Sequence, residues 1–304
     1  MSLVDELHQL FRLCLPSVVR EEATARRLLG DPENLILERR DENGSLIAAL
    51  VAHKNVVYLL CVHPDHRRRG LGSALLAEAE NAIRAQGYGE ILIGAGEDYL
   101  APGVPTSVMP YTESLASARI DPALDDSACS FFRRRGYEHA WGACNCFDMR
   151  MDLAELPACP QIGSEIDGIF YRWAVLADRP AICTCTDDAH EPFTKYYMDE
   201  ALYDEANSQR VLIALDGSKV CGTLIVSAET EAPGLGSVGC TAVAHAWRGR
   251  HIAANMILLG SRYLRDLGLK NGFLGYTYSG LDKLYGLAGY RICAYYLMAA
   301  KKLR

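Results

Sequence analysis

The segment Val62-His-Pro-Asp-His-Arg-Arg-Arg-Gly-Leu-Gly72 contains the strongest structural signal in this chain. It follows a β-rich apolar run over 56–61, and it opens a helical pattern in which Leu71, Leu75 and Ala79 share one face. Glycines at such a junction let the backbone approach a ligand closely. The free N–H groups of the first helical turn then point at that ligand, and a pyrophosphate fits there. The segment therefore predicts a strand, a phosphate-binding loop and a helix.

The same pattern recurs later in the chain, as Val243-Ala-His-Ala-Trp-Arg-Gly-Arg-His-Ile-Ala253. In both copies the arginine comes 5 residues after the valine, and a glycine that would end the helix, Gly87 or Gly268, comes 20 residues after the arginine. Each copy later has a short helical segment that ends in Gly-Tyr, over Phe131–Tyr137 and Leu284–Tyr290. A recurring unit of this kind indicates duplication of one domain.

The two copies differ in the length of one connection. Gly87 and Gly136 are 49 residues apart, whereas Gly268 and Gly289 are 21 apart, so the first copy carries an insertion of 28 residues near 97–125. A loop of this length inside a compact domain is more often functional than not.

Length and charge limit the possible classes of protein. A chain of 304 residues has room for two domains, and we expect an N-terminal domain over 1–153, a linker over 154–168 and a C-terminal domain over 169–304. The net charge of −7 argues against a nucleic-acid partner. Because the sequence shows neither an apolar run long enough to cross a bilayer nor a signal-peptide pattern, we expect a cytoplasmic protein without a membrane partner.

The 11 cysteines do not form a recognisable metal-binding pattern. Two pairs have C-x-C spacing, Cys144 with Cys146 and Cys183 with Cys185, whereas a structural zinc site favours two matched pairs with wider spacing. Most of the other cysteines, including Cys14 and Cys61, lie in apolar runs. We therefore expect reduced structural thiols and no metal.

Taken together, the motifs resemble those of the GNAT N-acetyltransferase superfamily. Val62–Gly72 looks like its acetyl-CoA signature, Q/R-x-x-G-x-G/A after the fourth strand, and Phe131–Tyr137 and Leu284–Tyr290 look like its late helix, F-Y-x-x-x-G-F. The resemblance implies an α+β fold with two GNAT-like domains, each a mixed twisted sheet flanked by helices and splayed between its fourth and fifth strands. It also implies that acetyl-CoA is the co-substrate and that its pantetheine arm lies in this gap. A primary amine of a small molecule or peptide would accept the acetyl group.

On this resemblance, both loops are candidate cofactor sites. In the first copy the candidates are Val62, Arg67, Arg68, Arg69, Gly70, Leu71 and Gly72; in the second they are Val243, Arg248, Gly249, Arg250, His251, Ile252 and Ala253. His251 replaces the first loop glycine, which adds bulk near the phosphates but removes no backbone N–H group.

The two copies also differ at the late helix. The first copy has Phe132 where the family often has tyrosine, whereas the second copy keeps Tyr285. A phenol there could protonate the leaving CoA thiolate, whose pKa resembles the value of about 8.5 for a free thiol. Tyr285 is therefore the candidate catalytic acid.

Several other polar residues are weaker candidates. Arg133–Arg135 could contact phosphate or form a solvated helix face, and a general base could lie among a few acidic and aromatic residues near the expected strand ends. The candidate bases are Glu97, Asp98, Tyr99, Glu229 and Glu231. His63 and His66 flank the first loop and could contact phosphate or be exposed turn residues. Tyr276 and Tyr278 would share one strand face and could line a pocket or pack in the core.

Two other functions stay open at this point. One is a non-catalytic module that binds or senses acyl-CoA, because neither copy keeps every feature of the family. The other is aminoacyl transfer from a charged tRNA, which the acidic charge and the intact pyrophosphate loop disfavour.

Overall fold

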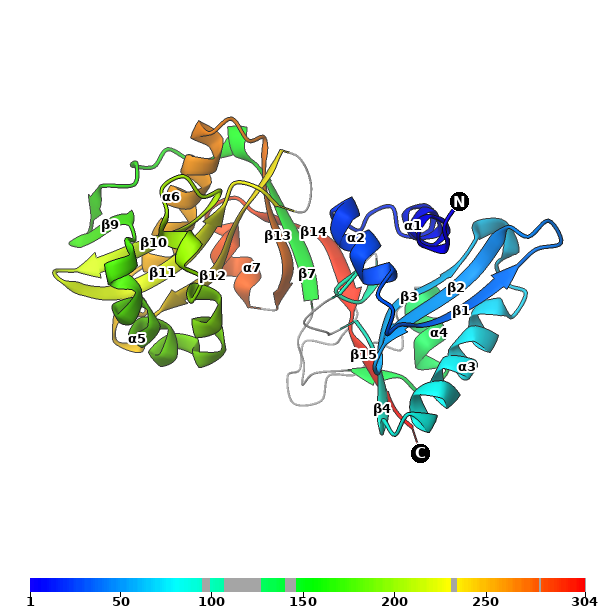
Figure 1. Cartoon of the computed structure of the whole chain (residues 1–304). Coiled ribbons are helices and arrows are strands. Elements are labelled where there is room, and N and C mark those ends of the chain that lie inside the picture. Colours follow the sequence, from blue (N-terminus) through cyan, green and yellow to red (C-terminus); the bar gives the residue numbers. More distant parts are fainter. Residues whose placement is uncertain (95–98, 107–126, 140–145, 231–233, 279, 304) are drawn as a thin grey trace. The chain divides into compact units, whose positions relative to one another are not determined.

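The computed structural model describes residues 1–94, 99–106, 127–139, 146–230, 234–278 and 280–303 (Figure 1). The chain forms two compact units. Unit 1 contains Met1–Phe147 together with Ala294–Arg304, and unit 2 contains Asp148–Cys293. No helix in the described ranges is long and apolar enough to cross a membrane.

This division differs from the boundaries 1–153, 154–168 and 169–304. The C-terminal segment belongs to unit 1 because its strand β15 (Ala299–Lys302) pairs with β4 (Glu90–Ile93), from Ala299 opposite Ile93 to Lys302 opposite Glu90. The segment expected as a linker lies inside unit 2 and includes the short strand β8 (Glu165–Ile166).

Unit 1 is built on a six-stranded mixed sheet with the order β1-β2-β3-β4-β15-β6, in which β3 and β4 are parallel. Its further strands are β1 (Leu35–Arg40), β2 (Leu46–His53), β3 (Val56–Val62) and β6 (Glu138–His139), and its helices are α1 (Leu3–Cys14), α2 (Glu22–Leu29), α3 (Leu71–Ala85) and α4 (Ser127–Arg133). The short strand β5 (Val104–Thr106) pairs with the end of β14 (Arg291–Leu297).

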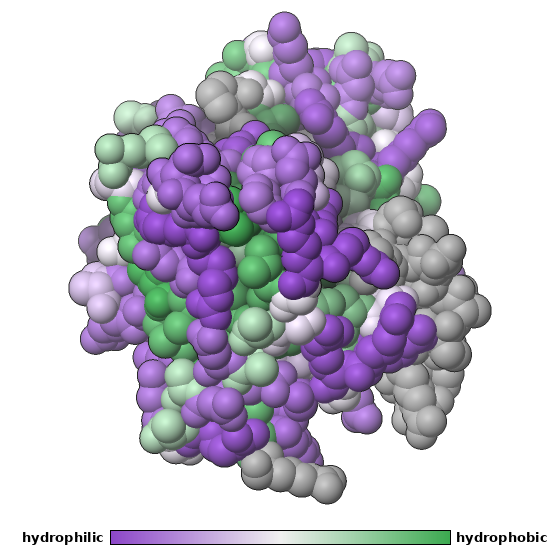
Figure 2. All heavy atoms as spheres, turned by 90° about the vertical axis from the view of Figure 1, so that its right-hand side faces the viewer, coloured by the Kyte–Doolittle hydropathy of each residue, from purple (hydrophilic) through white to green (hydrophobic). Residues whose placement is uncertain are grey.

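Strand β2 shows why helices cover both faces of this sheet. Five successive residues over 48–52 are buried, which requires cover on both sides, and α1 and α3 each pack against β2. On the α3 side, Leu75, Ala79 and Ile83 form a core with Leu50 and Tyr137. In Figure 2, hydrophilic residues cover much of the face turned to the viewer, and hydrophobic residues are visible toward its middle and left.

Unit 2 has a second mixed sheet, which includes the order β13-β12-β11-β10-β9-β8. Its further strands are β9 (Ile169–Trp173), β10 (Gln209–Asp216), β11 (Lys219–Ser227), β12 (Leu235–Val243) and β13 (Asn271–Tyr278), and β7 (Cys146–Asp152) and β14 carry the chain between the units. The helices of unit 2 are α5 (Arg179–His190), α6 (Ile252–Asp266) and α7 (Leu281–Gly286). Mixed sheets flanked by helices in both units confirm the predicted α+β class.

Each sheet opens where two parallel strands separate. In unit 2, β12 and β13 pair only at their first residues, Leu235 with Asn271 and Gly236 with Gly272. In the described part of unit 1, β3 and β4 pair only at Val56 with Leu92 and at Val57 with Ile93. The splay implied by the family resemblance is therefore present in both sheets.

Candidate functional site

The loop after β3 presents backbone donors toward the open side of unit 1. A 3₁₀ turn over Pro64–His66 leads to Gly70, the N-cap of α3, whose φ of 83° is a left-handed conformation that suits glycine. The first backbone bond across this helix end runs from the N–H of Ala74 to the carbonyl of Gly70, at 3.0 Å. No side chain caps this end and its first turn has no acidic residue, so the N–H groups over 71–73 and the helix dipole favour an anion.

A cleft of about 690 Å³ lies beside this loop. Its lining includes residues 57–62 of β3, the segment Cys14–Ser17 that begins at the last residue of α1, and most of the predicted loop residues. Of the loop candidates, Val62, Arg67, Arg68, Gly70, Leu71 and Gly72 line it, whereas Arg69 does not. The volume is in the range of small-molecule sites. The structure therefore brings the loop and the open edge of β3 together around one space.

The cleft is electropositive. Arg67, Arg68, Arg134 and Arg135 line it, and its described lining contains no carboxylate side chain. Arg135 donates to the hydroxyl of Ser73 and its guanidinium lies 3.7 Å from the ring centre of Phe131, which connects α4 to the first turn of α3. This charge suits a polyanionic ligand.

Unit 2 repeats the loop conformation. Arg248 donates from Nε to the carbonyl of Val243 at 3.2 Å, as Arg67 does to Val62 at 3.0 Å. Left-handed backbone occurs at the same two positions, Arg68 and Gly70 in unit 1, and Gly249 and His251 in unit 2. The repeat seen in the sequence is therefore a repeat in three dimensions.

The cationic groups of the unit 2 loop already have partners within unit 2. Arg250 forms an ion pair with Asp216 at 3.0 Å, and Arg248 donates to the carbonyl of Ala189 at 3.0 Å. The carboxylate of Asp188 accepts the N–H of His245 at 2.6 Å, and this bond lowers the pKa of Asp188. Less positive charge is therefore available to a phosphate here than in the cleft of unit 1.

His251 is the N-cap of α6 with φ 58°, where a residue other than glycine costs roughly 1 kcal/mol. We expect His251→Gly to raise the free energy of unfolding by about 0.5–1 kcal/mol, measured in urea. His251→Ala is the matched control, because it removes the imidazole but keeps the strained conformation, so it should not stabilise the protein. Binding of CoA to unit 2 should become stronger or stay the same. A clear loss of affinity would show that the imidazole is a ligand and would contradict this interpretation.

Tyr285 lies in α7, and its side chain is only 6% exposed. Its hydroxyl is 3.4 Å from that of Thr241 on β12, and burial raises the pKa of the phenol. The proton therefore stays on the hydroxyl at neutral pH, as a general acid requires. In unit 1 the corresponding Phe132 packs between Phe131 and Tyr137, with ring centres 5.1 and 5.3 Å away.

Each splayed strand contains a bulge that the sequence pattern did not predict. The register of β2 with β3 shifts so that no residue of β2 lies opposite Tyr58. The register of β11 with β12 shifts around Cys240, whose φ is 50°. No glycine lies beside Tyr58, whereas Gly239 directly precedes Cys240. A second pocket, of about 310 Å³, lies beside the bulge of β12; Tyr196, Asp199, Leu202, Gln209, Ile225, Ser227, Ser237, Gly239 and Cys240 line it.

The weaker candidates have different outcomes. Glu97, Asp98, Glu231 and Cys144 lie outside the described residues. His66 lines the cleft, whereas His63 accepts the N–H of Asp65 within its own turn. Arg134 and Arg135 line the cleft, whereas Arg133 does not. The guanidinium of Arg20 lies over the ring of Tyr99, and Glu229 is exposed. The ring centres of Tyr276 and Tyr278 lie 5.3 Å apart.

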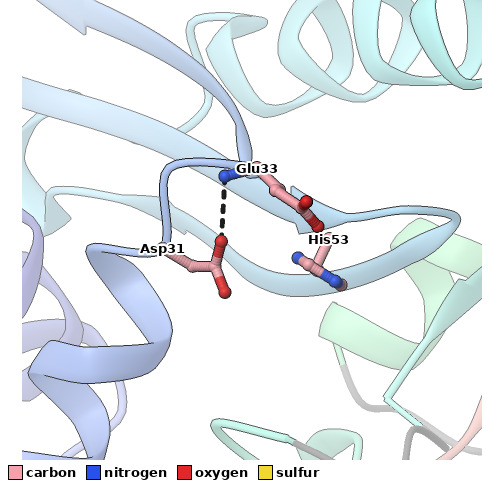
Figure 3. Close-up of side chains that lie close together, drawn as sticks. All are labelled: Asp31, Glu33 and His53. Carbon is pink, nitrogen blue, oxygen red and sulfur yellow. Dashed lines mark hydrogen bonds between the residues drawn. The ribbon is translucent and has the colours of Figure 1, made fainter.

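One group of potential metal ligands is present in the described part of the chain. Asp31 and Glu33, after α2, and His53, at the end of β2, each place one donor atom within 4.8 Å of the others (Figure 3). The carboxylate of Asp31 accepts the N–H of Glu33 at 2.8 Å, and Glu33 is exposed. A turn that holds its own acidic residue accounts for the positions of Asp31 and Glu33, and we assign no metal to the group.

Two family models match the chain. Residues 33–139 match the model described as acetyltransferase (GNAT) domain, and residues 177–283 match the one described as acetyltransferase (GNAT) family. An acetyltransferase of Yersinia pestis (strain Pestoides F) is 32% identical over 77 residues, which are 24% of this chain and 53% of the relative. One of Photorhabdus laumondii is 31% identical over 85 residues, 27% of this chain and 59% of the relative. The chain thus spans little more than half the length of these curated relatives.

Solved structures resemble almost the whole chain. A GCN5-related N-acetyltransferase from Sphaerobacter thermophilus matches with a TM-score of 0.63 at 21% identity, over 98% of this chain and 92% of that one. A tandem GNAT protein from the clavulanic acid biosynthesis pathway matches with a TM-score of 0.63 at 16% identity, over 99% of this chain and 95% of that one. At such identities these matches show the fold alone.

Proposed function

Because this chain belongs to the GNAT acetyltransferase family, with one domain over residues 33–139 and a second over 177–283, we propose that it transfers an acetyl group from acetyl-CoA to a primary amine. The acceptor would be a small molecule or a peptide. The observation that carries the proposal is the cleft of unit 1, where free helical N–H groups, four arginines and the open edge of β3 surround one space.

The cleft suggests how acetyl-CoA would bind. The N–H groups over 71–73 would bind the pyrophosphate, with Arg67 and Arg68 beside it. The pantetheine arm would run along β3, where the strand no longer pairs with β4. This path places the reacting carbonyl close to Val62, where a backbone donor would stabilise the developing oxyanion.

Transfer then needs two proton movements. The amine must be neutral when it attacks, so a base or a water chain takes its proton, and the leaving thiolate gains one. We assign the second step in unit 2 to Tyr285, because its buried hydroxyl is protonated and lies beside β12. In our proposal, the corresponding cofactor loop of unit 2 consists of Val243, Arg248, Gly249, Arg250, His251, Ile252 and Ala253.

The test is thiol release from acetyl-CoA across a panel of small amines and peptides, with CoA binding measured in parallel. The proposal predicts that at least one amine accelerates release and that the acetylated amine appears in equal amount. A protein that binds CoA but shows no amine-dependent release over the panel would contradict transfer and support a sensing module.

A further inference from the structure

Two cysteines and an arginine meet in the cleft of unit 1. Cys14 is the last residue of α1, is half-buried and lines the cleft. Its Sγ donates to the carbonyl oxygen of Val62 at 3.4 Å, and Arg67 donates to the same oxygen from Nε at 3.0 Å. The thiol and the guanidinium therefore converge at the residue where the proposed function places the reacting carbonyl.

Cys61, which is buried in β3, also lies beside Cys14. A hydrogen bond between the two thiols, together with the Arg67 guanidinium, lowers the pKa of Cys14 to about 7. The same hydrogen bond and burial hold the pKa of Cys61 well above its ordinary value. The thiolate is the nucleophilic form of cysteine, and partly exposed, electropositive surroundings are typical of reactive cysteines. Cys14 therefore has the environment of a nucleophile, and Cys61 has that of its hydrogen-bond partner.

From this cluster in the cleft, we infer that Cys14 accepts the acyl group from bound acyl-CoA and forms an acyl-cysteine. The inference rests on the proposed function, because it needs acyl-CoA along β3. The Cys14 thiol gives up its proton to solvent, and Sγ attacks the thioester carbonyl. A new sulfur–carbon bond forms as the bond to the CoA sulfur breaks, and the CoA thiolate takes up a proton. One thioester replaces another, so no further reactant is needed.

This route explains a difference between the two units. Attack by an amine produces a thiolate leaving group that benefits from an acid such as Tyr285, and Phe132 offers no hydroxyl at that position in unit 1. Exchange between two thiols of similar pKa needs no such acid. Unit 2 has Ala242 at the position of Cys61, and burial raises the pKa of its Cys185, which lies beside Ala244, to about 11. A thiol with that pKa stays protonated at neutral pH, so Cys185 serves as an internal control.

The experiment incubates the full chain with acetyl-CoA in the absence of amine and measures the intact mass after acid quenching. We expect a single added acetyl group that neutral hydroxylamine removes, that maps to the peptide containing Cys14 and not to that containing Cys185, and that appears together with free CoA. Cys14→Ser should lower both the adduct and the release of CoA at least tenfold. Cys293→Ser, a change at an exposed cysteine, should leave both at the parental level. If the acetyl adduct hydrolyses quickly, CoA release continues after the thiol has first been acylated, and this continued release still depends on Cys14, which also supports the inference.

Calorimetric titration with CoA distinguishes failure of this inference from failure of the proposed function. Parental binding by Cys14→Ser, together with loss of the adduct, is the expected result. A parent that binds CoA but forms no adduct and releases no CoA overturns the inference and leaves the proposed function intact. An adduct that resists hydroxylamine, or that persists in Cys14→Ser, also overturns the inference. A parent that binds no CoA overturns the proposed function itself.

Discussion

Tyr285→Phe is expected to lower turnover by about 10²–10⁴-fold, the usual contribution of a general acid. The change removes one hydroxyl, whose described contact is the 3.4 Å approach to Thr241, and little volume. Folding and acetyl-CoA binding should therefore hardly change. Because burial raises the pKa of Tyr285, the parental rate should fall only above the ordinary tyrosine value of about 10, and this alkaline limb should disappear in the variant. The measurement is steady-state thiol release as a function of pH with an accepted amine.

Two control variants isolate the role of this hydroxyl. Tyr290→Phe removes a neighbouring buried hydroxyl that bonds to Ser261 at 3.0 Å, so it should affect stability but not turnover. Phe132→Tyr adds a hydroxyl to unit 1 and should not raise the rate of amine transfer. Parental turnover in Tyr285→Phe would contradict the assignment of Tyr285 as the general acid and would place the proton transfers in unit 1.

Gly70→Asp is expected to weaken acetyl-CoA binding by unit 1 at least tenfold, which corresponds to about 1.4 kcal/mol. A Cβ on Gly70 would meet no atom within 4 Å, and aspartate tolerates a left-handed φ better than most residues, so the variant should fold. Its carboxylate would lie at the N-terminus of α3, where the pyrophosphate is proposed to bind. Calorimetric titration with acetyl-CoA measures the change.

Gly70→Asn is the matched control, because it has nearly the same shape without the charge. We expect most of the loss with aspartate and little with asparagine. Equal losses in both variants would mean that bulk, not charge, blocks the loop. Unchanged affinity and stoichiometry in a folded Gly70→Asp variant would remove the phosphate site from this loop.

The sequence was sufficient to predict the parts of the fold that depend on local pattern. The repeated loop predicted helices beginning at Leu71 and Ile252, and both begin there. The glycines expected to end them, Gly87 and Gly268, follow the last helical turns with φ of 92° and 87°. These features follow from helix periodicity and from the conformational freedom of glycine, which act over a few residues.

Features that depend on distant partners could not be predicted in this way. The pairing of β15 with β4 joins segments about 200 residues apart, and nothing local to 299–302 reveals it. Cys14 belonged to the group of cysteines expected to be structural, because its contacts with Cys61 and Arg67 cross about fifty residues. The bulge at Tyr58 has no glycine beside it, and the left-handed residue of the bulge in β12 is Cys240, not the preceding Gly239.

The proposed function requires that the cleft of unit 1 binds acetyl-CoA. A crystal structure of the full chain soaked with acetyl-CoA tests it most directly. We expect density for the pyrophosphate at the N–H groups over 71–73 beside Arg67 and Arg68, with the pantetheine arm along β3 and the thioester close to Val62 and Cys14. Ligand bound only elsewhere in the chain, with this cleft empty at saturating acetyl-CoA, would contradict it.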